Sequence, residues 1–138
     1  MKRRVLFLCT GNSARSQMAE GLLRRLAGDR YDVYSAGTHP VGLNPMAVAA
    51  MRELQIDISA QRSKRMDEFL DHAFDYVITV CDRAKESCPR WPHAGHLLHW
   101  NFEDPASAMG SSDEQLKVFR QVRDQIKARL EAFITAPW

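Results

Sequence analysis

The chain has 138 residues, of which 45% are hydrophobic and 26% are charged. These are ordinary values for a globular protein, and the length fits one compact domain over residues 1–138. The 19 Lys and Arg residues nearly balance the 17 Asp and Glu residues, leaving a formal net charge of +2. Because so small an excess creates no strong field, we expect neither a nucleic-acid partner nor binding to an anionic membrane.

The N-terminus and the cysteines indicate a cytoplasmic protein. Met1-Lys2-Arg3-Arg4 and the apolar run after it superficially resemble a signal peptide, but the run is too short and no small-residue cleavage site follows. No other segment approaches transmembrane length. The odd number of cysteines, three, argues against a disulfide scaffold. In a reducing cytoplasm such thiols are more often catalytic or redox-active than structural, and we expect the protein to be a monomer there.

Amphipathic segments alternate with four apolar runs, which predict β-strands at residues 4–8, 33–36, 76–80 and 97–100. The first predicted helix covers residues 17–27, with Gly28 as its stop and an apolar face made of Met18, Leu22 and Leu26. The second begins at Pro45, with Asn44 as its N-cap and an apolar face made of Ala47, Ala50, Met51 and Leu54. Residues 65–71 are expected to form a further short helix. The last helix opens with a capping box at residues 112–115, and its apolar stripe consists of Leu116, Phe119, Val122, Ile126, Leu130 and Phe133.

This alternation predicts an α/β fold, a three-layer sandwich with a central four-stranded parallel sheet. Such sheets bind ligands beyond the carboxyl ends of their strands. Cys9 ends the first strand, Cys81 follows the third, and Asp104 comes a few residues after the fourth. We therefore expect these three residues to converge on one cleft.

The loop after the first strand has the composition of an oxyanion-binding site. At a strand-to-helix junction the backbone N–H groups and the helix N-terminus point at one spot, and Arg15 adds a planar fork of donors. The same field favours a thiolate, so we expect Cys9 to be a nucleophile at neutral pH. The alternative is a buried, unreactive cysteine at a strand end. The expected oxyanion-binding residues are Thr10, Gly11, Asn12, Ser13, Ala14, Arg15 and Ser16.

Cys81 and Cys88 flank a charged segment, and this composition predicts an exposed loop outside the sheet. The two cysteines could be a redox-active dithiol, two unrelated thiols, or zinc ligands together with His93, His96 or His99. Their spacing is wider than the two to four intervening residues that are usual in zinc sites. We therefore expect a dithiol pair, and neither a metal ion nor a cofactor.

Asp104 precedes Pro105, and the commonest role of an Asp-Pro pair is to form a turn. Its predicted place in the cleft suggests a second role. An oxygen leaves a tetrahedral centre far more easily when it is protonated, and a carboxylic acid beside the thiolate can supply that proton.

Taken together, these motifs make the chain similar to the thioredoxin-coupled arsenate reductases, which share the low-molecular-weight protein tyrosine phosphatase fold. The likeness covers nearly the whole length. It rests on residues 9–21, Tyr34-Ser35-Ala36-Gly37, Asp57-Ile58-Ser59, Thr79-Val80-Cys81, Cys88-Pro89 and Asp104-Pro105-Ala106.

The resemblance implies that Cys9 attacks arsenate held by the loop and Arg15. Ser16 would hydrogen-bond the thiolate and Asp104 would protonate the departing oxygen. Cys81 would then attack Cys9 and release arsenite.

The remaining steps that the resemblance implies regenerate the enzyme. A Cys9–Cys81 disulfide would be resolved by Cys88, and thioredoxin would reduce the resulting Cys81–Cys88 disulfide. Each exchange needs only an accessible thiolate and a reachable sulfur.

Two positions depart from the family pattern. Many such reductases have a cysteine where Ala14 stands, but that position lies outside the three-thiol relay. Some members also bind potassium near the loop, through an aspartate whose place Lys64 takes here and through residues matching Asn12, Glu20 and Ser35. An ammonium group there could replace the ion.

Two other functions remain open at this point. A tyrosine phosphatase would need the same loop and Asp104 but neither Cys81 nor Cys88, and the phosphatases that this chain resembles usually carry an aromatic residue where Ala106 stands. An oxyanion sensor without catalytic activity would need neither Cys9 nor Asp104. The dithiol pair therefore favours the reductase.

Overall fold

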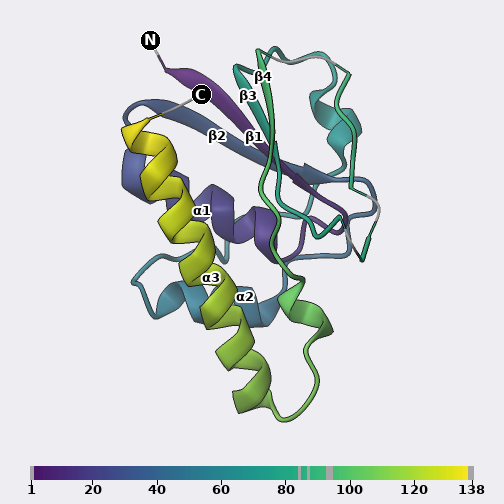
Figure 1. Ribbon diagram of the computed structural model, residues 1–138, viewed down its shortest axis with the longest axis vertical. Helices are drawn as coiled ribbons and strands as arrows, with labels where there is room; N and C mark the ends of the chain where they lie inside the picture. Colours follow the sequence, from purple (N-terminus) through teal and green to yellow (C-terminus); the bar gives the residue numbers. More distant parts are fainter. Residues whose placement is uncertain (1, 84, 87, 93–94, 137–138) are drawn as a thin grey trace.

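A four-stranded parallel sheet forms the centre of the computed structural model, which describes residues 2–83, 85–86, 88–92 and 95–136 (Figure 1). The strands, in the sheet order β2-β1-β3-β4, are β2 (Tyr31–Gly37), β1 (Arg3–Cys9), β3 (Tyr76–Thr79) and β4 (His96–His99). The helices are α1 (Arg15–Ala27), α2 (Pro45–Arg52), α3 (Ser112–Thr135) and two short 3₁₀ helices, η1 (Met66–Phe69) and η2 (Pro105–Ser107).

Strand β1 lies inside the sheet and pairs with β2 on one side and β3 on the other. Its residues 5–8 are fully buried, which is why the strand reads as a continuous apolar run. The register places Cys9 opposite Gly37 and Leu8 opposite Thr79. The parallel sheet expected from the sequence is therefore confirmed, and the ends of β1 and β3 meet at one edge.

The two faces of the sheet are covered differently. All three α-helices pack on one face, against a core that includes Val5, Phe7 and Ile78 (Figure 1). The opposite face is covered by η1 and loop residues, whose buried aromatic side chains pack against Leu6, Leu8 and Val77 and are Phe69, Phe74 and Trp91. The third layer of this α/β sandwich thus consists of a 3₁₀ helix and loops.

Helix α1 differs in two ways from the sequence-based expectation. It begins at Arg15 rather than at residue 17, directly after the loop. Leu26 is 37% exposed and does not belong to the apolar face, whereas Leu23 is fully buried. The physical reason is helical geometry: at 3.6 residues per turn, a run of residues four apart drifts off the buried face.

The caps of the other two helices account for their starts. Asn44 caps α2 through its side-chain oxygen, which accepts from the backbone N–H of Met46, as expected. The capping box of α3 lies one residue earlier than expected. Ser111, rather than Ser112, is the N-cap, because its hydroxyl and backbone N–H both pair with Glu114. The buried stripe of α3 follows the prediction from Phe119 to Phe133.

Within the described residues, no α-helix connects β3 to β4. After Cys81 the chain makes one tight turn, in which the backbone N–H groups of Lys85 and Glu86 both donate to the carbonyl of Asp82. The segment thus departs from the strand–helix alternation of the rest of the fold. In the described part of the chain, no helix is both long and apolar enough to span a membrane.

Gly37 generates a prediction for the stability of this edge. A Cβ atom there would lie 2.6 Å from the carbonyl oxygen of Cys9 and 2.5 Å from that of Thr10. Because backbone rather than a flexible side chain must move, Gly37→Ala is expected to lower the free energy of unfolding by about 3 kcal/mol, measured by urea denaturation. At Gly42, which has φ +94°, a Cβ meets nothing within 4 Å, so Gly42→Ala should cost only about 1 kcal/mol for backbone strain. Equal losses in the two variants would contradict this close-packing argument.

Candidate functional site

The loop between β1 and α1 brings the predicted nucleophile and the predicted oxyanion-binding arginine to one place. Cys9 is the last residue of β1 and Arg15 is the first of α1. Asn12, at the middle of the loop, has φ 44°, a left-handed conformation that asparagine tolerates better than most residues. The loop thus reverses the chain tightly between the strand and the helix.

A chain of buried hydrogen bonds leads to the thiol. The Sγ of Cys9 lies 2.8 Å from the Oγ of Ser16, which also accepts from Nδ2 of Asn12 at 2.8 Å. All three side chains are buried, and Cys9 is not disulfide-bonded. The serine hydroxyl is therefore positioned to donate to a thiolate, because Asn12 occupies its acceptor side.

The loop backbone is held from outside by residues that the sequence patterns did not mark. The amide of Gln17 donates to the carbonyl and side-chain oxygens of Asn12, both at 3.0 Å. The hydroxyl of Ser63 donates to the carbonyls of Gly11 and Asn12. The position of Gln17, directly after the loop, was the only sequence signal for these roles, since Ser63 lies 51 residues away from Asn12.

Lys64 lies beneath the loop, beside Glu20 and Asn12, as expected from the sequence. Its ammonium group is 3.5 Å from Oε1 of Glu20, and both side chains are less than 10% exposed. Ser35 donates to the same carboxylate oxygen and accepts from Asn12. Burial lowers the pKa of Lys64, an effect that the Glu20 carboxylate opposes. The ammonium group thus offsets the charge of the Glu20 carboxylate beneath the loop, together with Arg24, whose guanidinium lies 2.9 Å from the other carboxylate oxygen.

Arg15 is buried, and both terminal nitrogens of its guanidinium donate hydrogen bonds. Its two terminal nitrogens donate to the two carboxylate oxygens of Glu86, at 2.7 and 2.8 Å, and one of them also donates to the carbonyl of Phe102 at 3.1 Å. Burial by itself would lower the pKa of Arg15, but the hydrogen bonds to Glu86 and the nearby negative groups outweigh it and raise the pKa. Nothing in the sequence pattern marks Glu86, because charged residues in such a segment are typical of a solvated loop.

Asp104 also lies near this guanidinium, at the start of η2. One carboxylate oxygen accepts from the backbone N–H of Ala106, so Asp104 caps η2. The other is 3.9 Å from Arg15, and 41% of the side chain is exposed. Both roles considered for this residue are therefore compatible with its geometry, because the cap uses one oxygen and leaves the other at the cleft.

Two neighbouring cavities share Gly11, Arg15, Val41 and Asp104. The first, of about 470 Å³, is also lined by Thr10 and by acidic and basic groups of the 82–86 turn. The second, of about 310 Å³, also reaches Cys9 and is lined by two further loop residues, Ser13 and Ala14. Asn12 and Ser16 line neither cavity, since both side chains are fully buried beneath the loop.

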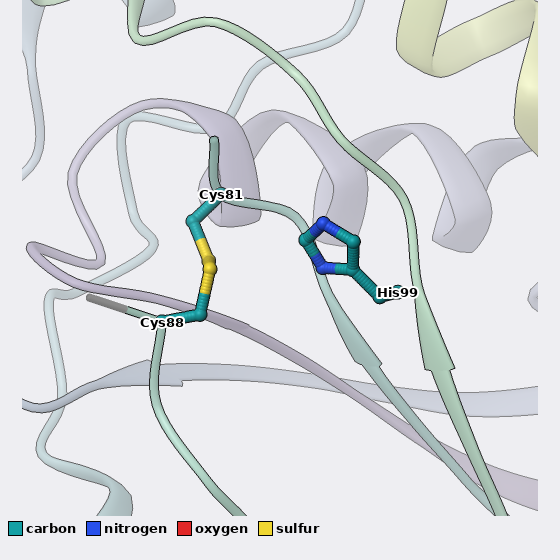
Figure 2. Close-up of side chains that lie close together, drawn as sticks. All are labelled: Cys81, Cys88 and His99. Carbon is teal, nitrogen blue, oxygen red and sulfur yellow. A yellow bond between two sulfur atoms is a disulfide. The ribbon is translucent and has the colours of Figure 1, made fainter. Parts of the chain in front are cut away.

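Cys81 and Cys88 are joined by a disulfide, with their Cα atoms 6.0 Å apart (Figure 2). Cys81 is fully buried at the end of β3, and Cys88 is partly exposed. Figure 2 shows the imidazole of His99, from β4, directed toward this pair. Its Nδ1 lies 2.7 Å from the hydroxyl of Thr79. The expected dithiol pair is therefore close enough to form and carry a disulfide.

Of the zinc ligands considered from the sequence, only Cys81, Cys88 and His99 lie together in the described residues. The sulfurs of Cys81 and Cys88 and a ring nitrogen of His99 lie within 4.8 Å of one another, so the reduced cysteines and this histidine could hold a metal ion. In the disulfide the sulfurs offer no thiolate ligands. His96 instead stacks on Tyr76, and His93 lies outside the described residues.

Comparisons with known proteins find relatives that span nearly the whole chain. A family model described as low molecular weight phosphotyrosine protein phosphatase matches residues 4–136. An arsenate reductase from Oceanobacillus iheyensis is 49% identical over 132 residues, which cover 96% of this chain and 95% of that protein. The solved structure of an arsenate reductase in the oxidized state has 36% identity and a TM-score of 0.81, covering 96% of this chain and 97% of that chain. A thioredoxin-dependent arsenate reductase from Corynebacterium glutamicum has 26% identity and a TM-score of 0.70, covering 98% of this chain and 63% of that chain.

The Lys64–Glu20 pair predicts how the fold responds to cations. Because the ammonium group already balances the buried carboxylate, an added cation has no unpaired charge to neutralise at this position. The melting temperature is expected to respond alike to potassium chloride and sodium chloride at equal ionic strength, as followed by circular dichroism. Selective stabilisation by potassium would show that Lys64 does not replace an ion.

Proposed function

This chain belongs to the low molecular weight phosphotyrosine protein phosphatase family, and we propose that it works within that family as an arsenate reductase. The observation that carries the proposal is the Cys81–Cys88 disulfide beside a loop whose own cysteine, Cys9, is a free thiol. A phosphatase needs only the loop and Asp104, whereas a reductase also needs a dithiol that can give up two electrons.

Arsenate binds as a tetrahedral oxyanion over the loop. The guanidinium of Arg15 and the N–H groups of residues 10–16 supply the donors, and the positive end of α1 favours the negative charge. Of the loop side chains, those of Asn12 and Ser16 act from below, by fixing the backbone and the thiol. Substrate binding therefore depends mainly on backbone amides and one arginine.

The first chemical step joins Cys9 to arsenic. The Cys9 thiolate attacks arsenate, an S–As bond forms, and one oxygen leaves as water after taking a proton from Asp104. The hydrogen bond between Ser16 and Cys9 orients the sulfur for this attack. The carboxylate oxygen of Asp104 that faces Arg15 is the one available for this proton transfer.

The second step reduces arsenic. The Cys81 thiolate attacks the sulfur of Cys9, and an S–S bond forms while the S–As bond breaks with its electron pair going to arsenic. Arsenic thereby changes from As(V) to As(III) and leaves as arsenite. Cys88 then attacks Cys81, which restores the Cys9 thiol and yields the disulfide seen in the structure.

The strand order supports the reach that this relay requires. Strands β1 and β3 are neighbours, and the backbone N–H of Val80 donates to the carbonyl of Leu8 at 2.9 Å. Cys9 and Cys81 each follow one of these two paired residues. Neighbouring strands lie about 4.8 Å apart, so local movement at the end of β3 suffices to bring the two sulfurs together.

Thioredoxin is the proposed reductant, which returns the Cys81–Cys88 disulfide to the dithiol by supplying two electrons. The partly exposed Cys88 offers a sulfur to an incoming thiolate, whereas Cys81 is buried. The thioredoxin-dependent relative supports this choice. We place the protein in the cytoplasm, because a free nucleophilic thiol and a recycling dithiol need a reducing compartment. We propose that it works there as a monomer.

The three cysteines separate a reductase from a phosphatase by mutation. Cys9→Ser should abolish both arsenate reduction and hydrolysis of an aryl phosphate such as p-nitrophenyl phosphate, because both require the loop nucleophile. Cys81→Ser and Cys88→Ser should reduce multiple-turnover arsenate reduction to background while leaving any aryl phosphate hydrolysis within about twofold, since they lie outside the ester-cleaving machinery. Multiple-turnover, thioredoxin-linked reduction by the Cys88→Ser protein would rule out the relay.

The identity of the reductant is tested by reconstitution. With thioredoxin, thioredoxin reductase and NADPH, arsenate should support steady NADPH oxidation, followed by the absorbance of NADPH. Glutathione with glutaredoxin should support little turnover, because thioredoxin has the lower reduction potential and is therefore the stronger reductant of a protein disulfide. Equal or faster turnover with glutathione and glutaredoxin would exclude thioredoxin as the preferred partner.

A further inference from the structure

The carboxylate of Glu86 occupies the donors that an oxyanion substrate would use. Its two oxygens accept from the two terminal nitrogens of Arg15 at 2.7 and 2.8 Å, in a bidentate arrangement. The hydroxyl of Thr10, another loop residue, donates to one of these oxygens at 3.2 Å. A carboxylate and an oxyanion both present two oxygens to the planar fork of a guanidinium, so the two compete for the same face of Arg15.

Glu86 reaches this position because of the turn that follows Cys81. The backbone N–H of Glu86 donates to the carbonyl of Asp82, and the backbone N–H of Asp82 donates to the Glu86 carboxylate at 3.3 Å. The turn lies inside the ring that the Cys81–Cys88 disulfide closes. A short closed ring restricts where its members can go, which raises the effective concentration of the carboxylate at Arg15.

The surroundings keep this carboxylate charged. Burial alone would raise the pKa of Glu86, but the hydrogen bonds and charge of Arg15 outweigh it and the pKa is lowered. The Glu86 side chain is 20% exposed, and that of Arg15 is 5% exposed, so the pair is only weakly screened by water. An ionised carboxylate in this position therefore competes strongly with a dissolved anion.

We propose that the Glu86 carboxylate occupies the oxyanion site, as an intramolecular competitor of the substrate, when Cys81 and Cys88 are disulfide-bonded. In that state its carboxylate holds Arg15 and excludes oxyanions. In the dithiol state the ring is open, the turn is no longer tethered to Cys88, and an arriving oxyanion displaces the carboxylate. Of the proposed function, this proposal assumes only that the loop between β1 and α1 binds an oxyanion.

This exclusion would make binding follow the redox state. An enzyme whose Cys81 and Cys88 are oxidised cannot complete another reduction, so arsenate bound to it would be held unproductively. Inorganic phosphate, a tetrahedral anion of the same charge class, would also be kept from the oxidised enzyme. Through the Arg15–Glu86 contact, a new oxyanion would bind only after the Cys81–Cys88 disulfide left by the previous cycle has been reduced.

The test measures inorganic phosphate binding by isothermal titration calorimetry to the complete protein in both redox states. One sample is reduced with a phosphine and the other oxidised with diamide, and thiol counts confirm three free thiols and one free thiol respectively. The comparison is made for the wild-type protein, for Glu86→Ala and for Glu103→Gln. Glu103 lines the same cavity as Glu86, so the Glu103→Gln variant removes one negative charge there without touching the Arg15–Glu86 contact.

We expect the oxidised wild-type protein to bind phosphate about tenfold or more weakly than the reduced one, the scale of a charge-assisted bidentate contact. Glu86→Ala should remove this difference by strengthening binding to the oxidised protein, whereas Glu103→Gln should preserve it. Equal phosphate affinities of oxidised wild-type and oxidised Glu86→Ala protein would overturn the proposal. So would a redox difference that persists in Glu86→Ala.

Two further measurements keep these outcomes interpretable. The reduced Glu86→Ala protein should bind phosphate at least as tightly as the reduced wild-type protein does, because no carboxylate has to be displaced from Arg15, and such binding shows that the variant folds with an intact loop. A reduced wild-type protein that fails to bind phosphate would overturn the proposal at its premise, the oxyanion site. Phosphate is not reduced, and diamide forms the disulfide without arsenate. The binding test therefore does not depend on arsenate turnover, and a failure of the proposed function can be distinguished from a failure of Glu86 to block the site.

Discussion

The site depends on the hydrogen bonds of Asn12. Its left-handed backbone turns the loop, its side-chain oxygen accepts from the backbone of Lys64 at 2.7 Å, and its amide donates to Ser16 and Ser35. These bonds are buried, so each lost partner would leave a polar group without water to replace it. One side chain thereby fixes the backbone that faces the substrate and the hydroxyl that faces Cys9.

The connection between β3 and β4 adds a second kind of chemistry to this loop. It carries both cysteines of the disulfide and the carboxylate that contacts Arg15, and within the described residues it is not organised as an α-helix. The residues between the two cysteines include no large apolar side chain, so we expect this part of the connection to open at a lower free energy than the core. A relay that moves a disulfide from one sulfur to another requires that freedom, while β1 and α1 keep the binding loop rigid.

The same loop can therefore serve two reactions, and the residues beside it select between them. A thiolate, an arginine and Asp104 suffice to transfer a phosphoryl group, which is the chemistry that the family name describes. A dithiol at the end of the neighbouring strand allows electrons to leave the loop sulfur. The disulfide between Cys81 and Cys88, with Cys9 free, fits the end of such a relay.

The sequence by itself determined the elements and the chemistry that local patterns encode. Apolar runs defined the strands, the caps defined helix starts to within two residues, and the pattern from Cys9 to Arg15 marked the loop, because these signals lie between residues close in the chain. Only the tertiary structure decided that Ser63 holds the loop and that Glu86 contacts Arg15. Such partners lie 51 to 71 residues apart, and no periodicity relates them. Their meeting follows from strand order and from the path of a loop, which are settled by how the whole chain packs.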